Sequence, residues 1–281
     1  MNIRVMGVYR ETEFSPGKVD ADAAIIEAVL AHLGAAGAKT ATVNASRFVS
    51  EPLPEAQLVL AMCQGGPALS RLAAAEEAGA VTINSALAIR NCYRDLLGKG
   101  LLRARVPTPE GGVVRTSEPL DLKPLRGLDL SSPMYVKRGD LHALGPNDVR
   151  RVEGLEQLEA MLLRFSRRGV AAAYVQQEAA GEVVKFYGVG GGEYFSAVAP
   201  EGGVIGEGTK LALAHAAAQA AAALGLEVWG GDAVVNGDRF SIIDFNDWPS
   251  FARVRDEAAR AIARRCTLLL RRRPAARALM A

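Results

Sequence analysis

The segment that decides the fold reads GLEVWGGDAVVNGDRFSIIDFNDWPSF and spans residues 225–251. It contains two strand-like runs joined by Asn-Gly-Asp at 236–238, a sequence typical of a tight turn between antiparallel strands. Side chains alternate between the two faces of a strand, so Asp244 and Asn246 share one face of the second run. The apolar residues between and beside them point the other way. The segment therefore predicts a hairpin with one polar and one apolar face.

The register of this hairpin decides on which face Asp232, from the first strand, lies. A two-residue turn at Asn-Gly would place Asp232 opposite Ser241, on the face away from Asp244. A three-residue loop over 236–238 would place Asp232 opposite Ile242, on the same face as Asp244. The two carboxylates would then be diagonal neighbours about 7–8 Å apart. We expect an odd loop or a bulge, because only these bring the two carboxylates together.

Asp232, Asp244 and Asn246 are the candidate metal ligands. Side-chain oxygens are the ligands that Mg²⁺ prefers in proteins, and a phosphate or water would complete its shell. The alternative is a polar strand face that only contacts solvent. Asp and Asn are depleted in strand interiors, which favours the metal site.

Composition limits the class of protein. The chain has 281 residues, 49% hydrophobic and 23% charged, which is typical of a folded protein of about two domains. Its 33 basic and 31 acidic residues give a net charge of +2, so neither nucleic acid nor a membrane surface is an expected partner. The sequence has no 18-residue apolar run, signal-peptide pattern or metal-like cysteine spacing. We expect a cytoplasmic protein with reduced thiols.

Strands and helices alternate in the first third of the chain, which predicts a parallel sheet with ligands beyond the carboxyl ends of its strands. The later part reads as mostly antiparallel strands with a few helices. The expected elements of the first third are strands at 3–8, 40–43, 58–62 and 80–84 and helices at 20–33, 67–78 and 84–102. Further on we expect strands at 134–138, 172–178, 183–189 and 194–198 and helices at 154–168, at 209–224 with Gly225 as its cap, and from about 255.

Lysines on two predicted strands are candidate phosphate ligands. Lys137 lies in MYVKRG and Lys185 in EVVKFYGV, and two converging cations would hold a polyphosphate. The alternative for each is a lysine whose stem lies along the surface and whose ammonium reaches water. Gln177 and Glu178 end a strand where the chain turns, so their backbone groups could read the edge of an adenine. A polar turn between strands is the alternative there.

These motifs together resemble the ATP-grasp superfamily over the whole chain. YVQQEAAGEVVKFYGVGG, at 174–191, is similar to the strand–hinge–strand that holds adenine, and the 225–251 hairpin is similar to the family's metal segment. The resemblance implies a fold of mixed α/β and α+β class. Its parts would be a Rossmann-like N-terminal domain (1–84), a connecting helical segment (85–110), a lid subdomain (111–178) and a mostly antiparallel nucleotide- and metal-binding domain (179–281).

The resemblance also implies roles for the residues. Lys137 and Lys185 would contact the phosphates of ATP, and Gln177 and Glu178 would border its adenine. Asp232, Asp244 and Asn246 would hold one or two Mg²⁺ ions, which Mn²⁺ could replace. The segment RNCYRDLLGKGLLRARVPTP is similar to the place where the family has an Asp-Lys pair, and Arg94 falls near that lysine. The expected catalytic residues are Arg94, His142 and Arg253.

Two departures from the ligases of the family affect the expected reaction. Asp244 stands where those ligases usually have Glu, and the lid loop RGDLHALGPND carries His142 where a small residue is common. Both features are more similar to the inositol-phosphate kinase branch. We expect a ligase that joins a small carboxylate to an amine through an acylphosphate. A small-molecule kinase is the alternative, and a nucleotide-binding regulator without activity is the second alternative.

The acceptor of the reaction is expected to be a small anionic molecule. Arg10, Lys18, Arg253 and Arg255 are candidate contacts for it, with His142 arriving from the lid, although solvated surface charges are the alternative for each. Relatives of this fold are often oligomers, so a homodimer is one arrangement that the resemblance allows.

Overall fold

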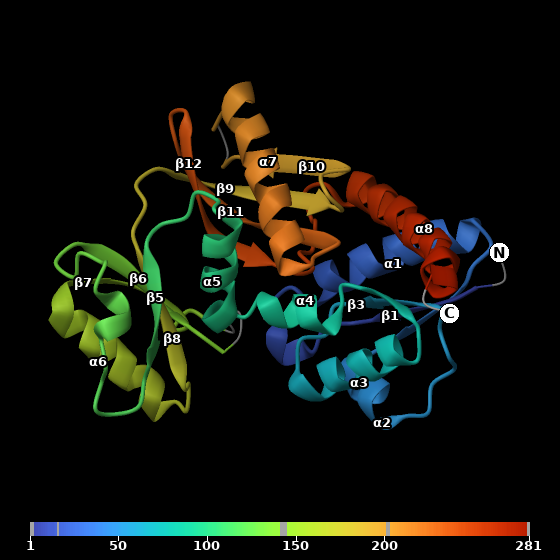
Figure 1. The fold of residues 1–281 in the computed structure, drawn as a ribbon, viewed down its shortest axis with the longest axis horizontal. Helices are drawn as coiled ribbons and strands as arrows, with labels where there is room; N and C mark the ends of the chain where they lie inside the picture. The colour runs from blue at the N-terminus through green and yellow to red at the C-terminus, as the bar shows by residue number, and fades with distance from the viewer. Residues whose placement is uncertain (1–2, 16, 141–144, 201–202, 280–281) are drawn as a thin grey trace.

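The computed structural model describes residues 3–15, 17–140, 145–200 and 203–279, the last seven by their backbone only. Within these residues the chain forms three four-stranded sheets. Figure 1 shows the N-terminal sheet with its helices on one side, the sheet that contains the 225–251 hairpin in the centre, and the remaining sheet on the other side. None of the described helices is long and apolar enough to cross a membrane.

The N-terminal sheet is parallel, as the alternation of elements predicted. Its strand order is β2-β1-β3-β4. All residues of β3 are buried, because helices cover both faces of a parallel sheet. The strands are β1 (Arg4–Val8), β2 (Lys39–Val43), β3 (Leu58–Ala61) and β4 (Val81–Ile83), and the helices are α1 (Val19–Ala35), α2 (Ala45–Ser50) and α3 (Gly66–Glu77), with a 3-10 turn η1 (Thr12–Phe14).

The single helix expected over 84–102 is wrong. Two helices occupy this stretch, α4 (Ala86–Asn91) and α5 (Arg94–Ala104), and Tyr93 between them has an extended backbone. The side chain of Tyr93 makes tertiary contacts: its hydroxyl donates to the carbonyl of Gln64, and the Arg90 guanidinium lies over its ring. These contacts favour the break over a continuous helix, and local propensity could not reveal them.

The second sheet is antiparallel, in the order β5-β8-β6-β7. Its strands are β5 (Gly111–Arg115), β6 (Pro133–Arg138), β7 (Val149–Glu153) and β8 (Ala172–Gln177), and α6 (Gly154–Arg167) packs on one face, with a 3-10 turn η2 (Lys123–Leu125) nearby. The two edge strands, β5 and β7, are absent from the sequence-based expectation. Edge strands often carry charges and breaks in the apolar pattern, as the exposed Arg150 and Arg151 of β7 do here.

The third sheet, in the order β10-β9-β11-β12, is antiparallel and has two different faces. Its aromatic face packs against α7: the ring centroids of Phe186 and Phe245 are 5.4 Å apart and those of Trp229 and Phe245 5.7 Å apart. As expected, α7 ends at Gly225, whose φ of 79° is left-handed. The elements are β9 (Glu182–Val189), β10 (Tyr194–Val198), α7 (Glu207–Leu224), β11 (Val228–Asn236) and β12 (Arg239–Asn246).

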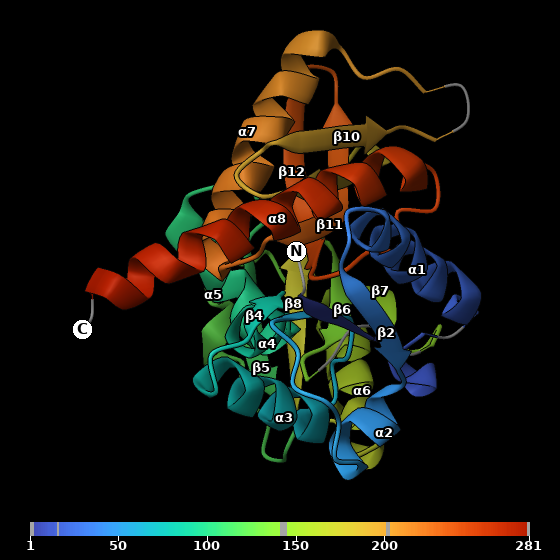
Figure 2. The same ribbon diagram turned by 90° about the vertical axis from the view of Figure 1, so that its right-hand side faces the viewer.

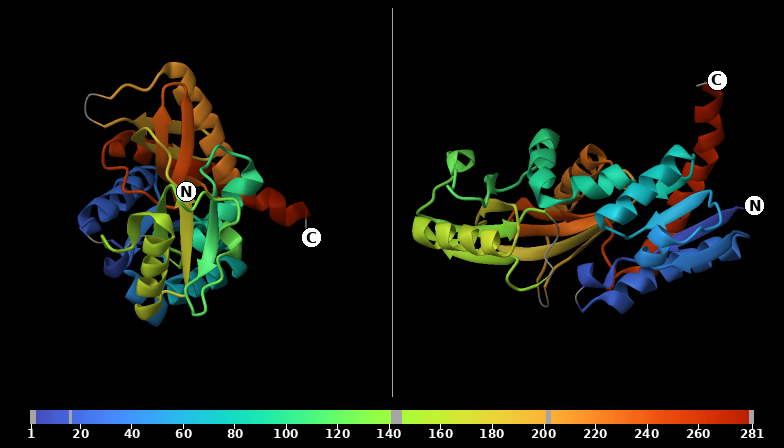
Figure 3. Two further views of the ribbon diagram at one scale, coloured as in Figure 1. Left: turned by 90° about the vertical axis from the view of Figure 1, so that its left-hand side faces the viewer. Right: turned by 90° about the horizontal axis from the view of Figure 1, so that it is seen from below.

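The last helix, α8 (Arg255–Leu279), returns to the N-terminal domain. Its buried residues Ala259, Ile262 and Cys266 share one core with Ile25 and Ile26 of α1. Figure 2 shows α8 crossing beside α1, and Figure 3 shows its C-terminal turns extending beyond the body. Tyr187 and Val228 belong to the same core, so the third sheet and the N-terminal sheet are parts of one packed unit.

The 225–251 hairpin contains a bulge. Asn236 pairs with Arg239, so the turn is the two-residue Gly237-Asp238. It is neither of the two loops considered from the sequence, the Asn-Gly turn and the three-residue loop. The register then shifts between Ala233, which pairs with Ile242, and Asp232, which pairs with Asp244. The expected odd loop or bulge is therefore confirmed as a bulge. The predicted diagonal is wrong, because the extra residue brings the two carboxylates directly opposite each other.

Candidate functional site

Four polar residues form an open cluster on the face of the third sheet that points away from α7. They are Lys185, Asp232, Asp244 and Asn246. Lys185 pairs with Asp232 across β9 and β11, Asp232 pairs with Asp244 across β11 and β12, and Asn246 follows two positions on. Lys185 Nζ lies 2.7 Å from Asp232 Oδ1, and the side chains of these two residues are 54% and 25% exposed. The cluster is therefore accessible to a ligand.

Arg94 approaches this cluster from the start of α5. Its side chain is 4% exposed, and its Nη2 lies 2.9 Å from Asp244 Oδ2. The other oxygen, Asp244 Oδ1, accepts from the backbone N–H of Phe245 at 3.1 Å. The structure thus brings Arg94 to the predicted metal carboxylate, and its expected catalytic role stays a prediction.

Lys137 connects the second and third sheets. Its side chain is buried, and Nζ donates to Gln176 Oε1 at 2.8 Å and to the carbonyl of Ile243, the extra residue of the bulge, at 2.7 Å. Burial lowers the pKa of Lys137 to about 8, against the opposing attraction of Asp244. An anion beside Lys137 would stabilise its protonated form and raise this pKa again.

Gln176 was missed by the sequence reasoning. It is 2% exposed, and its Nε2 has no hydrogen-bond partner among the described residues. Its Oε1 accepts from Lys137, so the amide presents a donor to any ligand that reaches this point. The signal was present in YVQQE, because strand alternation places Gln176 on the face of Tyr174, which pairs with Lys137.

The side chains of Gln177 and Glu178 have partners within the second sheet. The Gln177 amide donates to the carbonyl of Pro133 at 2.9 Å, and Glu178 forms an ion pair with Arg151 at 2.9 Å. Their backbone N–H groups donate to the carbonyls of Glu110 and Pro133 at 2.8 and 3.0 Å. The adenine contact expected of this pair stays a prediction, and their N–H groups already have partners.

A second, closed cluster fastens the N-terminal domain to the chain that follows β12. It consists of Arg10, Asp22, Gln64 and Asp247. Gln64 Nε2 donates to Asp247 Oδ1 at 2.8 Å, and both residues are buried. Arg10 donates to the carbonyl of Trp248 at 2.7 Å and lies 3.5 Å from Asp22 Oδ2. Arg10 therefore makes contacts within the protein, and its expected role at an acceptor pocket stays a prediction.

The other residues expected at the acceptor make different contacts. Arg253 is exposed and donates to the carbonyl of Ala199 at 3.4 Å. Lys18 is exposed at the start of α1. Arg255 begins α8, and its buried Nε has no hydrogen-bond partner among the described residues. His142 lies outside the described residues, so its expected role stays a prediction.

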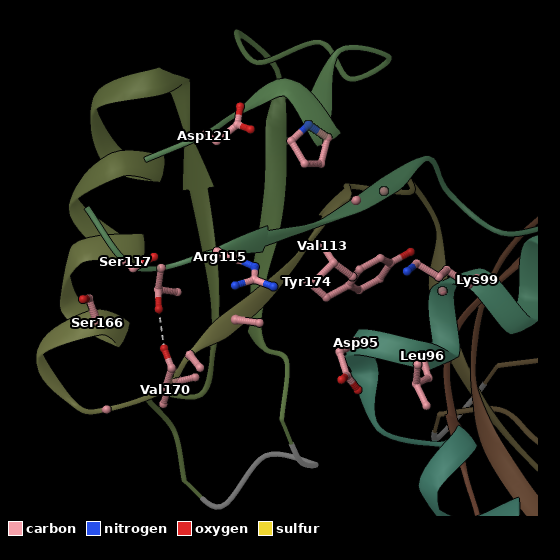
Figure 4. A pocket seen from close by; sticks show the side chains of 18 of the residues that line it. Asp95, Leu96, Lys99, Val113, Arg115, Ser117, Asp121, Ser166, Val170 and Tyr174 are labelled. Atoms are coloured by element: carbon pink, nitrogen blue, oxygen red, sulfur yellow. Dashed lines mark hydrogen bonds between the residues drawn. The ribbon is translucent and has the colours of Figure 1, made fainter. Parts of the chain in front are cut away.

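A cavity of about 1140 Å³ lies between α5 and the second sheet. Figure 4 shows Asp95 and Lys99 of α5 on one side of it and Arg115 on the other, with Tyr174 of β8 between them. Residues of the open cluster do not line this cavity. It lies between α5 and strands β5 and β8.

The open cluster suits a divalent metal that also binds phosphate. It offers two carboxylates and one amide oxygen on one face of the sheet, the hard oxygen ligands that Mg²⁺ takes. Among the described residues no group of three or more His, Cys, Asp or Glu side chains is arranged to hold a metal. The remaining ligands would therefore have to come from water or from a phosphate.

Comparison with known proteins identifies the fold. No family model matches the sequence, and no curated protein matches it. The VanG D-Ala:D-Ser ligase from Enterococcus faecalis is similar in structure, with a TM-score of 0.73, 11% identity and coverage of 96% of this chain and 100% of that one. D-alanine–D-alanine ligase from Bacillus anthracis complexed with ATP is also similar. Its TM-score is 0.72 at 12% identity, and the match covers 96% of this chain and 99% of that one. An ATP-grasp RimK domain protein from Sphaerobacter thermophilus DSM 20745 has a TM-score of 0.67 at 19% identity, and the match covers 94% of this chain and 99% of that one. The chain has the ATP-grasp fold.

Proposed function

We propose that this protein is a Mg-ATP-dependent ligase that joins a small carboxylate to an amine through an acylphosphate. The observation that supports this most is the meeting of Lys137, Lys185 and Arg94 with the opposed carboxylates Asp232 and Asp244, where two sheets of an ATP-grasp fold face each other. Three cations beside two carboxylates leave an excess of positive charge, which suits a polyphosphate. The ligases of similar structure support the reaction type only through the shared fold.

The lysines would bind the nucleotide. Lys185 is exposed enough to exchange Asp232 for a phosphate oxygen, and Lys137 has a further N–H beyond the two that it donates to Gln176 and Ile243. Asp232, Asp244 and Asn246 would hold one or two Mg²⁺ ions, or Mn²⁺ in their place. When bound, the metal would offset charge on the phosphates and hold them in line for attack.

The reaction has two steps. An oxygen of the substrate carboxylate attacks the γ-phosphorus, the bond from that phosphorus to the bridging oxygen of ADP breaks, and an acylphosphate forms. The amine nitrogen then attacks the acyl carbon, inorganic phosphate leaves, and the amine gives up a proton. The side chains of the site contribute by neutralising phosphate charge and by orienting the reactants, and both effects lower the barrier.

The acceptor is proposed to be a small anion that contacts Arg253, with His142 of the lid loop as a second contact. Arg253 is the exposed cation of the chain that follows the metal strand, and its guanidinium has donors beyond the one directed at Ala199. A carboxylate could bind it in bidentate fashion. A homodimer is part of the same proposal and is carried by the resemblance alone. A cytoplasmic location is also proposed, and it is carried by the sequence pattern alone.

A small-molecule kinase is the second candidate. Asp244, at the position where ligases of the family usually have Glu, favours it. In a kinase the acceptor hydroxyl or phosphate takes the γ-phosphoryl group, and no second step follows. A regulator without activity is disfavoured because the whole set of cations and carboxylates is present.

The test is a ³¹P NMR survey of Mg-ATP with pooled amino acids, small peptides, polyols and inositol phosphates. ADP and free phosphate that appear only when a carboxylate and an amine are both present would support the ligase. A new phosphomonoester signal with ADP and no free phosphate would establish the kinase instead. The Asp244→Asn variant serves as the control, because either activity should disappear with the metal ligand.

A further inference from the structure

Each carboxylate of the open cluster already has a cation of the protein beside it, and the two cations differ in freedom. Lys185 lies 2.7 Å from Asp232 with its side chain 54% exposed, so it can move to a phosphate. Arg94 lies 2.9 Å from Asp244 with its side chain 4% exposed. A long lysine in solvent has many rotamers, whereas a buried guanidinium is held by its surroundings.

Arg94 is fixed by its place in the fold. It is the first residue of α5, and Leu97 and Leu101 of that helix are buried in the core that includes α7 and the aromatic face of the third sheet. Its neighbour Asp95 turns to Arg90, which binds it through two hydrogen bonds of 2.8 Å. The helix thus presents two adjacent charged residues to two different partners, and Arg94 is directed at Asp244.

This placement has a consequence for a metal. Asp244 Oδ2 accepts from Arg94 and Oδ1 from the N–H of Phe245, so a divalent ion at this carboxylate would share an oxygen with a permanently charged guanidinium. Two cations on one carboxylate repel each other in a partly buried site. The negative charge of a triphosphate would offset this repulsion.

We propose that Arg94 is the resident counter-ion of Asp244 and makes metal binding at this carboxylate depend on the nucleotide. This inference rests on the nucleotide and metal site of the proposed function. Arg94 is then a positioning residue: it holds the Asp244 carboxylate in place and sets the affinity of the site for a metal that arrives without phosphate. Mg²⁺ would enter the site together with ATP.

The experiment measures Mn²⁺ binding by the full-length protein with and without ADP, using electron paramagnetic resonance. Without ADP, Arg94→Gln should bind Mn²⁺ about tenfold more tightly than the natural chain, because one unit charge near the ion is removed. Arg94→Lys keeps the charge and should remain near the natural affinity. Arg90→Gln is the matched control: it removes a neighbouring arginine that binds Asp95, and it should leave Mn²⁺ affinity unchanged.

With ADP present, the difference between Arg94→Gln and the natural chain should shrink. Equal Mn²⁺ affinity of these two proteins without ADP, with Mn²⁺–ADP binding intact, would overturn the role of Arg94 and leave the proposed function standing. If neither the natural chain nor any variant binds Mn²⁺, with or without ADP, the role of Arg94 and the proposed function are both wrong. If Arg94→Gln does not fold, tight Mn²⁺ binding by the natural chain or by Arg94→Lys without ADP would overturn the inference by itself.

Discussion

The closed and open clusters contain the same kinds of side chain but differ in what those side chains contact. In the closed cluster, Gln64 and Asp247 are buried and bonded to each other, and Arg10 donates to backbone carbonyls on two sides. In the open cluster, Lys185 and Asp232 are bonded to each other but remain 54% and 25% exposed. Both clusters lie near β12, which ends between them.

The difference indicates how each cluster contributes. A buried polar group that loses its partner costs the fold the full desolvation of the group left behind. An exposed ion pair adds little to stability, so its loss should change ligand affinity more than the free energy of unfolding. The closed cluster should therefore control the free energy of unfolding, and the open cluster should control ligand binding and turnover.

The largest expected effect separates the two clusters by activity. Asp244→Asn should lower Mg-dependent ATP turnover by about 100-fold or more, because even residues that only support a metal ligand cost 10–100-fold. ADP release measures this, and the melting temperature checks that the variant folds with Arg94 deprived of its carboxylate. Asp238→Asn, in the exposed turn of the same hairpin, is the control. Turnover that survives in Asp244→Asn would remove Asp244 from the metal site.

Lys185→Met should weaken ATP binding by about 10- to 100-fold, since a charge-assisted hydrogen bond contributes about 1.5–3 kcal/mol. The unfolding free energy should change little, because the side chain is mostly exposed. Calorimetric titration with ATP provides the affinity. Lys210→Met, on α7, is the matched control and should bind ATP like the natural chain. Unaltered affinity in Lys185→Met would mean that this lysine is a surface residue.

The pH dependence of ATP binding tests Lys137. Burial lowers its pKa to about 8, and phosphate needs the protonated form, so ATP affinity should fall above pH 8 by up to about tenfold per pH unit. Stability should move the opposite way, because an unfolded lysine, with a pKa of about 10.4, binds more protons than the native one between pH 8 and 10. Titrations from pH 7 to 9.5 measure the affinity. Lys137→Met should bind ATP weakly, with an affinity that does not change with pH. If the affinity of the natural chain is equally independent of pH, Lys137 is not a phosphate ligand.

Gln64→Leu should affect only the closed cluster. It removes a buried hydrogen bond to a carboxylate and should lower the free energy of unfolding by about 1.5–3 kcal/mol. Urea unfolding measures the loss. ATP affinity should stay within about twofold of the natural value, because no atom of Gln64 belongs to the open cluster. A large loss of affinity with unchanged stability would show that the two clusters are not separate in function.

The smallest effect is expected for Glu178→Ala. The ion pair with Arg151 is 28% and 47% exposed on its two sides and contributes about 0–1 kcal/mol. ATP affinity should be nearly unchanged, because the Glu178 carboxylate is already paired with the Arg151 guanidinium. Isothermal titration calorimetry measures the ATP affinity. A tenfold loss would mean that Glu178 borders the nucleotide, as the resemblance implies, in spite of its ion pair with Arg151.

Much of the fold and part of the site could be predicted because they depend on local pattern. The parallel N-terminal sheet follows from strands that alternate with helices, and the end of α7 follows from Gly225. The edge strands β5 and β7 escaped prediction because an edge lacks the apolar alternation of a central strand. The break at Tyr93 escaped it because the partners of that side chain lie elsewhere in the chain.

The sequence by itself determined that Asp244 and Asn246 share a strand face, because the period of a strand is a local property. It also placed Lys137 and Lys185 on strands. Only the tertiary structure decided that a bulge sets Asp232 opposite Asp244, that Ile243 offers its carbonyl to Lys137, and that Arg94 reaches Asp244 from 150 residues away. Register and long-range ion pairs depend on which segments the packed core brings together, and no local pattern encodes that choice.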